Sequence, residues 1–406
     1  MAIFDISLAD LSPGISGVIA TEMVLLWNSR PKSAERHARM MQPYRTRGTM
    51  VSTDAAGLST LTQRYSLPQV MKLISEPKEV IHALGRAIGG EAIGVWAADN
   101  TQMFYPDSIE PAQVITQMRE VQRRLKALTV QVGMGVHQVE CYRIAGGLFG
   151  PDVDMIEEVA EERTHGGEIV VSAPVLAQLA EPLRETASQR ADLQSYGELW
   201  SLSDDGEQLV VSEGSDINYP TPFDAAFFAT LRATPLSALE HTSFRSYCLT
   251  PTVAFVRTAH RRHEYLLDEF TDMSLIDLAF RRIASSYKGD VVKSNGVLAI
   301  VLFDGTDAAI AFSRDIIETT RTLGLDAHVG LTRGEVFLFP LASGGRDIAG
   351  NPVNIASKLA EDSGLRGVLV ESSALTAPLA AQLAASAEPF GLTISRVTLT
   401  GYRIPV

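Results

Sequence analysis

Two stretches of this chain, set about 200 positions apart, are versions of one motif. They are Gly150–Val159, with the sequence GPDVDMIEEV, and Gly350–Leu359, with the sequence GNPVNIASKL. The same offset relates Gly167 to Gly367. A chain that repeats itself at about half its length is usually two copies of one domain. The copies keep their apolar frame and differ at polar positions, which predicts one composite site in place of two equal ones.

Bulk properties set the class of protein. The 406 residues allow two domains of ordinary size, and 46% apolar with 20% charged residues is typical of a soluble globular protein. A net charge of −13 argues against nucleic-acid binding, because phosphate neutralisation needs a basic surface. It leaves room for an anionic nucleotide held together with a metal ion. The two cysteines, Cys141 and Cys248, exclude a disulfide framework and fit a cytoplasmic location.

The first 47 residues form a leader. Its apolar run, Gly14–Trp27, contains Glu22, is short for a membrane span and lacks the features of a signal peptide. This pattern predicts a buried helix or an interface helix. The basic stretch Arg30–Arg47 is better explained as a solvated helix face than by the alternative, contact with a membrane surface.

The rest of the chain divides into a first domain at 48–203, a linker at 204–240 and a second domain at 241–406. The linker contains SDDGEQLVVSEGSDINYPTP, which is rich in Ser, Asp, Gly and Pro. Strands and helices alternate in the same order in both halves, which predicts an α/β sheet covered by helices. The expected strands are 49–53, a pair within 92–105, 129–136 and 168–171, then 247–256, strands within 291–303, 327–332 and 368–370. The expected helices are a stretch that follows residue 53 and extends to about residue 88, then 111–128, 261–286, 307–322 and 352–361.

The segment Asp347–Gly364 (DIAGNPVNIASKLAEDSG) resembles the class III nucleotidyl cyclase homology domain, and the resemblance extends over nearly the whole chain from Thr49. It implies an α+β sandwich of the ferredoxin-like type, in two copies that form a pseudo-two-fold intramolecular dimer. It also implies that Asp347 reads the purine, Asn354 orients the ribose and Lys358 holds the phosphates. The strand VKSNGVL implies that Lys293 contacts adenine.

The first half resembles the metal-binding end of the same family. The stretch MVSTDAAGLSTL is similar to the segment whose aspartate binds metal, which would be Asp54, and Asp99 is the candidate for the second metal aspartate. The resemblance implies two divalent ions, Mg²⁺ or Mn²⁺. Each assignment has a plainer alternative: Asp54 as a turn residue before glycine, Asp99 as part of a hairpin turn, and Lys293 as an edge charge.

In this family a site takes metal ligands from one domain and purine contacts from the other. One such site would combine Asp54 and Asp99 with Lys293, Asp347, Asn354 and Lys358. The opposite site would place Pro251 and Val297 at the metal positions, and Val95, Gly147, Asp154 and Glu158 at the contact positions. Pro and Val cannot hold a cation and Glu158 would repel phosphate, so we expect the second site to be inactive.

The resemblance implies an adenylate cyclase that converts ATP to 3′,5′-cyclic AMP and pyrophosphate. Lys358 stands where the family usually has arginine. The usual triphosphate positions, Gln138 and Thr400–Tyr402, are not basic, which leaves Arg143, Arg346 and Arg403 as candidates. The alternative is an inactive pseudo-cyclase that binds a nucleotide or a protein, and a third hypothesis is a structural scaffold. A regulatory protein partner and a homodimer are both compatible with the sequence.

Overall fold

The computed structural model describes residues 6–11, 21–96, 100–202, 211–214, 218–239, 243–259, 263–341, 345–394 and 397–406. The chain divides into two compact units. The first unit is Arg39–Glu240. The second unit is His241–Val406 together with Met1–Ala38, so the start of the chain belongs with its C-terminal part. The predicted linker, 204–240, groups with the first unit.

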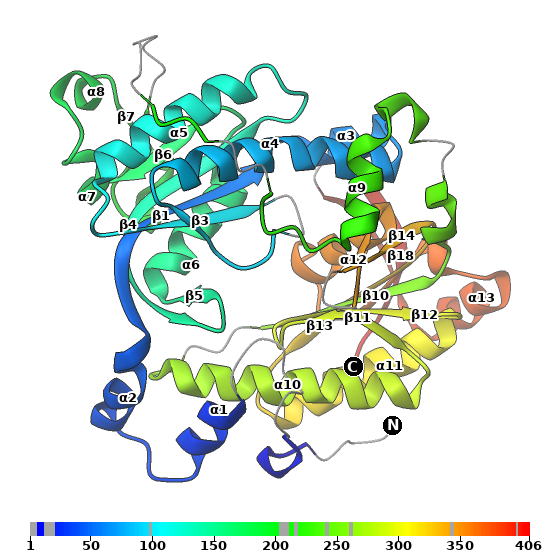
Figure 1. The fold of residues 1–406 in the computed structure, drawn as a ribbon. Coiled ribbons are helices and arrows are strands. Elements are labelled where there is room, and N and C mark those ends of the chain that lie inside the picture. Colours follow the sequence, from blue (N-terminus) through cyan, green and yellow to red (C-terminus); the bar gives the residue numbers. More distant parts are fainter. Residues whose placement is uncertain are drawn as a thin grey trace. The chain divides into compact units, whose positions relative to one another are not determined.

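The described residues of the first unit form one sheet, whose strands follow the order β2-β3-β1-β4-β6-β8-β7, with β5 paired to β4 (Figure 1). The strands are β1 (Arg45–Ala55), β2 (Glu91–Ala92), β3 (Thr101–Pro106), β4 (Val132–Ile144), β5 (Gly147–Phe149), β6 (Ile169–Ser172), β7 (Ser188–Gln189) and β8 (Leu199–Leu202). The helices are α3 (Leu58–Arg64), α4 (Leu67–Ala87), α5 (Pro111–Leu125), α6 (Pro151–Glu158), α7 (Ala173–Leu176), α8 (Glu181–Glu185) and α9 (Ala225–Ala233).

The main sheet of the second unit has the matching order β11-β12-β10-β13-β16-β18-β17, and a small sheet has the order β15-β14-β9. The strands are β9 (Cys248–Leu249), β10 (Thr252–Thr258), β11 (Asp290–Ser294), β12 (Leu298–Phe303), β13 (Ala327–Arg333), β14 (Val336–Pro340), β15 (Arg346–Ala349), β16 (Gly367–Glu371), β17 (Glu388–Ile394) and β18 (Val397–Ile404). The helices are α1 (Thr21–Asn28), α10 (Leu266–Ser286), α11 (Thr306–Thr322), α12 (Asn351–Glu361) and α13 (Ala377–Ser386); α2 (Ala34–Met41) crosses the boundary between the units.

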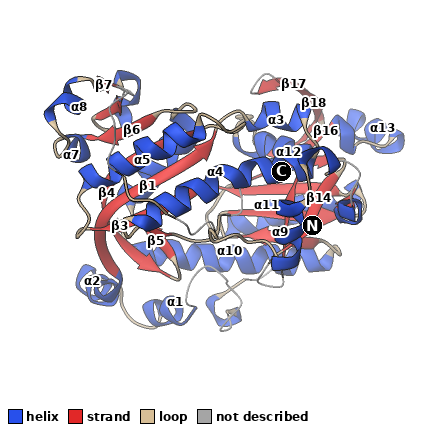
Figure 2. Cartoon of the chain, turned by 45° about the horizontal axis from the view of Figure 1, so that its top comes forward, coloured by secondary structure: helices blue, strands red, loops and turns tan. Residues whose placement is uncertain are grey.

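Each unit therefore has a main sheet covered by helices, as the sequence predicts, and the alternation of blue helices and red strands is visible in Figure 2. Local sequence explains the boundaries of the long helices. Ser66 and Gln69 form a capping box at the start of α4, where the Ser66 N–H donates to Gln69 Oε1 at 2.8 Å. None of the helices in the described residues is both long and apolar enough to cross a membrane.

The repeated motif begins the same helix in both units. Gly150 precedes α6 with φ +146°, and Gly350 precedes α12 with φ +148°. Such dihedral angles are open to glycine and strained for other residues. The two glycines of the sequence repeat are thus explained by one backbone conformation at the N-terminus of α6 and of α12.

Candidate functional site

The strand register defines which residues of the two units correspond. In the first unit, Ser52 of β1 lies between Gly135 of β4 and Gln102 of β3. In the second unit, Phe255 of β10 lies between Gly330 of β13 and Ile300 of β12. A Cβ atom on Gly135 would meet Ile156 of α6, and one on Gly330 would meet Ala356 of α12, so the helix packs at the same point of both sheets. Ser52 and Phe255 are equivalent positions.

This register corrects one prediction about the second unit. Two residues beyond Ser52 is Asp54, and two residues beyond Phe255 is Arg257, so Arg257 and not Pro251 stands at the metal-aspartate position. Arg257 Nε lies 3.7 Å from Glu361 Oε1 of α12. A guanidinium cannot ligate a cation, so Arg257 is no better suited to metal binding than Pro251. Val297, the residue expected at the other metal position, has an apolar side chain. Its backbone carbonyl accepts hydrogen bonds from Thr258 N at 2.8 Å and from Thr258 Oγ1 at 2.9 Å, which closes a turn.

Asp54 is half-buried, one residue before the end of β1, and pairs with Gly133 of β4. Asp99 lies outside the described residues. Among the residues that are described, no three His, Cys, Asp or Glu side chains lie close enough together to hold a metal ion. Asp54 is thus the one predicted metal ligand whose position is known.

The structure brings the two predicted purine contacts together. Lys293 lies on β11 and Asp347 on β15, and Lys293 Nζ is 3.7 Å from Asp347 Oδ2. The Asp347 side chain is only 11% exposed, whereas that of Lys293 is 41% exposed. Asp347 Oδ1 also accepts from the Ile348 N–H at 2.8 Å, which fixes the carboxylate. A buried acceptor therefore stands beside a half-exposed donor.

Asn354 and Lys358 both lie on α12, which follows β15 after Gly350. They are four residues apart, so they share one face of the helix, and both are half-buried. The Asn354 N–H donates to the Gly350 carbonyl at 3.2 Å in the first turn. All four predicted nucleotide contacts therefore belong to the second unit, and Asp54 belongs to the first.

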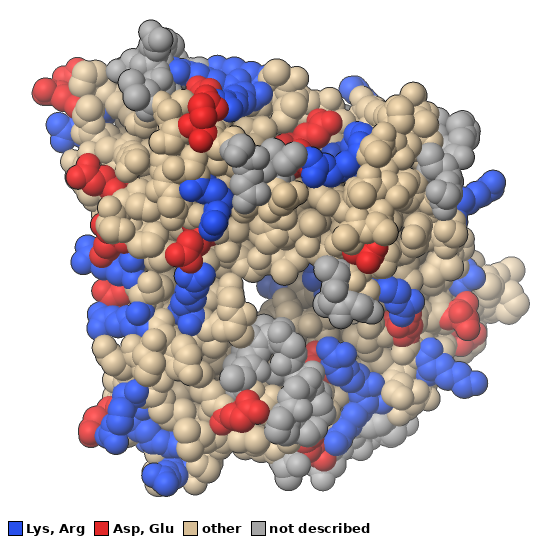
Figure 3. All heavy atoms as spheres, viewed as in Figure 1, with Lys and Arg blue, Asp and Glu red and all other residues tan. Residues whose placement is uncertain are grey.

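The candidate triphosphate cations are already paired with carboxylates. Arg143 Nη1 lies 2.5 Å from Glu91 Oε2, Arg346 Nη2 lies 2.8 Å from Asp290 Oδ2, and Arg403 Nη1 lies 2.9 Å from Glu388 Oε2. Basic and acidic side chains are likewise interspersed over the face seen in Figure 3. A phosphate group would have to compete with these carboxylates for each guanidinium.

Sequence reasoning missed a basic residue at the equivalent of Gln138. Gln138 pairs with Thr49 of β1, and Arg333 pairs with Thr252 of β10 at the same register. Arg333 Nη1 donates to Thr252 Oγ1 at 3.1 Å and to the Asp304 carbonyl at 2.9 Å. A basic residue, expected at Gln138 in the half that carries the predicted metal ligands, thus stands in the other half. Sheet register, which one sequence does not show, was needed to find it.

The first unit has carboxylates where the second has contact residues. Asp154 and Glu158 of α6 are the counterparts of Asn354 and Lys358, and Tyr196 donates its hydroxyl to Glu158. Burial raises the pKa of the neighbouring Glu157 to about 8, and the negative charges of Glu161 and Asp154 add to this. Such a helix face disfavours a triphosphate by like-charge repulsion.

A second difference lies between the long helix and the end of the central strand. In the first unit this region is an apolar cluster that includes Ala55, Val70, Leu73, Ile74 and Val130. The equivalent residues of the second unit are Thr258, Glu269, Asp272, Met273 and Leu325, and they line a hollow of about 20 Å³.

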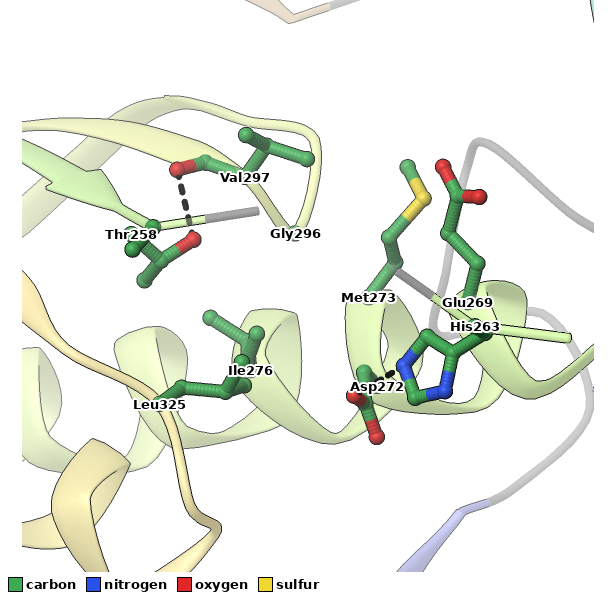
Figure 4. A pocket seen from close by; sticks show the side chains of 10 residues that line it. Thr258, His263, Glu269, Asp272, Met273, Ile276, Gly296, Val297 and Leu325 are labelled. Atoms are coloured by element: carbon green, nitrogen blue, oxygen red, sulfur yellow. Dashed lines mark hydrogen bonds and ion pairs between the residues drawn. The ribbon is translucent and has the colours of Figure 1, made fainter. Parts of the chain in front are cut away.

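Figure 4 shows this hollow with the His263 ring directed at Asp272, and His263 Nε2 lies 2.7 Å from Asp272 Oδ2. The volume suits about one water molecule and is far too small for a nucleotide. The hollow is therefore a different kind of site from the one predicted to bind a nucleotide.

Comparison with known structures accounts for the repeated topology. A crystal structure described as a class III adenylyl cyclase-like ATP-binding protein from Pseudomonas aeruginosa covers 85% of this chain and 93% of its own, with 12% sequence identity and a TM-score of 0.53. The chain has the class III nucleotidyl cyclase fold, in two copies.

Other cyclase structures cover about one copy each. The adenylyl cyclase CyaB from P. aeruginosa covers 41% of this chain and 97% of its own, at 12% identity and a TM-score of 0.35. The guanylyl cyclase Cya2 covers 42% and 98%, at 16% identity and a TM-score of 0.34. No protein-family model matches the sequence, and no curated protein matches it either.

Proposed function

We propose that this protein binds ATP through its second unit and converts it to 3′,5′-cyclic AMP and pyrophosphate at one composite site that also uses Asp54, with Asp99 as the second acidic residue. The observation that carries the proposal is the Lys293–Asp347 pair, a donor and an acceptor 3.7 Å apart on strands of two different sheets of the second unit. The ATP-binding description of the P. aeruginosa protein of like fold supports the choice of nucleotide.

The purine contacts favour adenine. Its N1 accepts a hydrogen bond and its N6 amine donates one, which suits the Lys293 ammonium and the Asp347 carboxylate. Guanine presents the opposite polarity at these two positions, so it would place its N1–H beside Lys293. On α12, Asn354 would orient the ribose and Lys358 would bind the phosphates as a point charge, without the two-pronged contact of an arginine.

Divalent ions fit the acidic half of this proposal. Carboxylate oxygens suit Mg²⁺ or Mn²⁺, and the triphosphate oxygens would supply further ligands beside Asp54 and Asp99. Such ions would activate the ribose 3′-hydroxyl and stabilise the leaving pyrophosphate.

A second candidate function is nucleotide binding without turnover, in signalling through a protein partner. It is favoured by the ion pairs that occupy Arg143, Arg346 and Arg403 and by the neutral Gln138. Under this hypothesis the nucleotide would be a regulatory ligand of the protein and not its substrate.

Calorimetric titration with a non-hydrolysable ATP analogue and Mn²⁺ tests binding, and mass-spectrometric detection of cyclic AMP from ATP tests turnover. We expect Lys293→Ala and Asp347→Ala to weaken ATP binding at least tenfold, since each removes a purine contact. We expect Asp54→Ala to abolish cyclic AMP formation while the analogue still binds. Binding with no product in the wild type would establish the second function. Absence of ATP binding would overturn both.

A further inference from the structure

The long helix α10 of the second unit carries a docked segment from the start of the chain. Trp27 of α1 is fully buried, and its Nε1 donates to Asp268 at 2.8 Å. Asn28 Nδ2 donates to Thr271 Oγ1 at 2.8 Å, and Lys32 Nζ lies 2.6 Å from Asp268 Oδ1. The Trp27 ring also packs edge-on against Tyr265, with ring centroids 5.4 Å apart. Figure 1 shows α1 beside α10.

The long helix α4 of the first unit carries a docked segment from the residues that precede the second domain. Lys72 Nζ donates to the carbonyls of Arg232 and Thr234 at 2.7 Å each. Gln69 Nε2 donates to the Leu236 carbonyl at 2.8 Å. Arg232 Nε lies 3.1 Å from Glu79 Oε1, and the apolar side of α9 is buried.

The two segments dock at the same positions of equivalent helices. Helices α4 and α10 both span 21 residues and are followed by the same turn, in which Gly90 and Gly289 donate back into the helix end. Gln69 and Asp268 are each the third residue of the helix, and Lys72 and Thr271 are each the sixth. The side chains at these two positions differ in chemistry, but both copies use the same surface of the long helix for docking.

We infer that the segments preceding the two copies are reciprocal docking arms, each of which binds the long helix of the other copy. The first arm, Thr21–Ala38, leads into β1 of the first unit and binds α10 of the second. The second arm, Asp224–Leu239, leads towards β10 of the second unit and binds α4 of the first. The partner of each arm is thus the duplicated domain of the same chain.

The arms give the chain a second connection between its units, independent of the peptide chain near residue 240. The first arm is covalently part of the strand that begins the first unit and is anchored on the second unit by a buried tryptophan. Buried aromatic side chains with a satisfied N–H are the usual energetic centres of protein interfaces. The first arm therefore holds the two halves together even when the linker is cut, whether or not the site turns over a nucleotide.

A cleavable linker tests this inference on the full chain. A site-specific protease sequence inserted between Glu240 and His241 would allow cleavage into 1–240 and 241–406 after folding. We expect the cut wild-type protein to elute as one particle in size-exclusion chromatography. We expect Trp27→Ala and, separately, Asp268→Ala to weaken the association of the fragments by about thirtyfold or more, as at an interface hot spot.

Leu26→Ala is the matched control, since Leu26 is the neighbour of Trp27 on α1 and its side chain is 53% exposed. This variant should leave the association unchanged. Circular dichroism of each uncut variant establishes that it folds. If Trp27→Ala does not fold, Asp268→Asn takes its place in the experiment. Separation of the cut wild-type fragments would overturn the inference, and so would equal association of the wild type, Trp27→Ala and Asp268→Ala.

Discussion

The two units share a strand order but differ at nearly every polar position that could touch a nucleotide. Asp54 of the first unit corresponds to Arg257 of the second, Gln138 to Arg333, and Asp154 to Asn354. Apolar positions on the helix after the repeated motif, such as the buried core residues Val153 and Val353, are retained, whereas the apolar cluster around Ala55 is partly replaced by polar residues. The difference teaches that the fold depends on the apolar frame and backbone, while the polar positions are free to diverge.

With one exception, the polar residues that differ are divided between the two units in a consistent way. The predicted nucleotide contacts lie in the second unit and Asp54, the predicted metal ligand, lies in the first. Arg333 departs from this division, since a basic residue at its position would serve the site only from the first unit. The comparison therefore predicts which member of each equivalent pair matters.

The largest expected effect distinguishes Asn354 from Asp154. We expect Asn354→Ala to lower cyclic AMP formation by about 300-fold, or about 3.4 kcal/mol, because an aligned contact to the reacting nucleotide is lost. Asp154→Ala, at the equivalent position of α6, should change the rate less than about twofold. Initial rates with ATP and Mn²⁺ measure both variants. Equal losses in the two would show that the units contribute alike.

A second pair of variants compares packing at the equivalent glycines. A Cβ on Gly330 would lie 2.1 Å from the Ala356 carbonyl oxygen, whereas a Cβ on Gly135 would lie 2.9 Å from Ile156 Cδ1 and 3.0 Å from the Ile156 carbonyl oxygen. We expect Gly330→Ala to lower the free energy of unfolding by about 3 kcal/mol and Gly135→Ala by about 1 kcal/mol, since the added methyl group at Gly330 overlaps the backbone much more closely. Urea titration gives the totals. Hydrogen exchange in β4 and β13 shows which unit loosens, and equal costs would contradict the difference in packing.

A third comparison uses pH. Burial raises the pKa of Glu157 from its ordinary 4.5 to about 8, and Ser357 is its counterpart in α12. A carboxyl group with a higher pKa in the folded state binds more protons folded than unfolded, so stability falls as the pH rises from about 4.5 to about 8.

Glu157→Gln removes that titration. We expect it to raise the free energy of unfolding by about 2 kcal/mol at pH 8 and to leave it nearly unchanged at pH 4.5. Ser357→Ala should show no such pH dependence. Thermal unfolding at the two pH values measures both, and an effect of Glu157→Gln that is the same at both would exclude the raised pKa as its cause.

The smallest expected effect concerns Gln138, whose counterpart in the second unit is Arg333. Gln138 accepts a hydrogen bond from Gln178 Nε2 at 2.8 Å. We expect Gln138→Arg to raise the rate of cyclic AMP formation about tenfold, because it adds a cation on the strand where the triphosphate needs one. Arg333→Gln should leave the rate unchanged. If neither Gln138→Arg nor Gln138→Arg combined with Lys358→Arg raises the rate of cyclic AMP formation, the result would favour nucleotide binding without turnover.

The sequence predicted the fold well because the repeat and the apolar periodicity can be seen directly in the order of the residues. The helices after Gly150 and Gly350 begin where the motif places them, and Lys293 and Asp347, both predicted to contact the purine, lie 3.7 Å apart. The observed β1 is longer than the expected strand at 49–53, and α10 begins at Leu266, later than the expected residue 261.

The misses share one physical cause: strand register is a tertiary property. The offset between the copies changes along the chain wherever one copy has a longer loop. The sequence alone therefore placed Pro251 where the sheet places Arg257. It also equated Gly167 with Gly367, whereas the pairing of Met134 with Ile169 and of Val329 with Val368 differs from that match by one residue. The anchoring of Trp27 on Asp268, 241 positions away, leaves no trace in local sequence.

The equivalent docking positions on α4 and α10 bear on how such a chain arose. If the arms are exchanged between the copies as we infer, an ancestor with a single domain and its leading segment would have exchanged these segments between two molecules. Joining two such molecules end to end preserves both exchanges within one polypeptide. Once fused, neither copy had to keep a whole set of ligand-binding groups, and each was free to specialise.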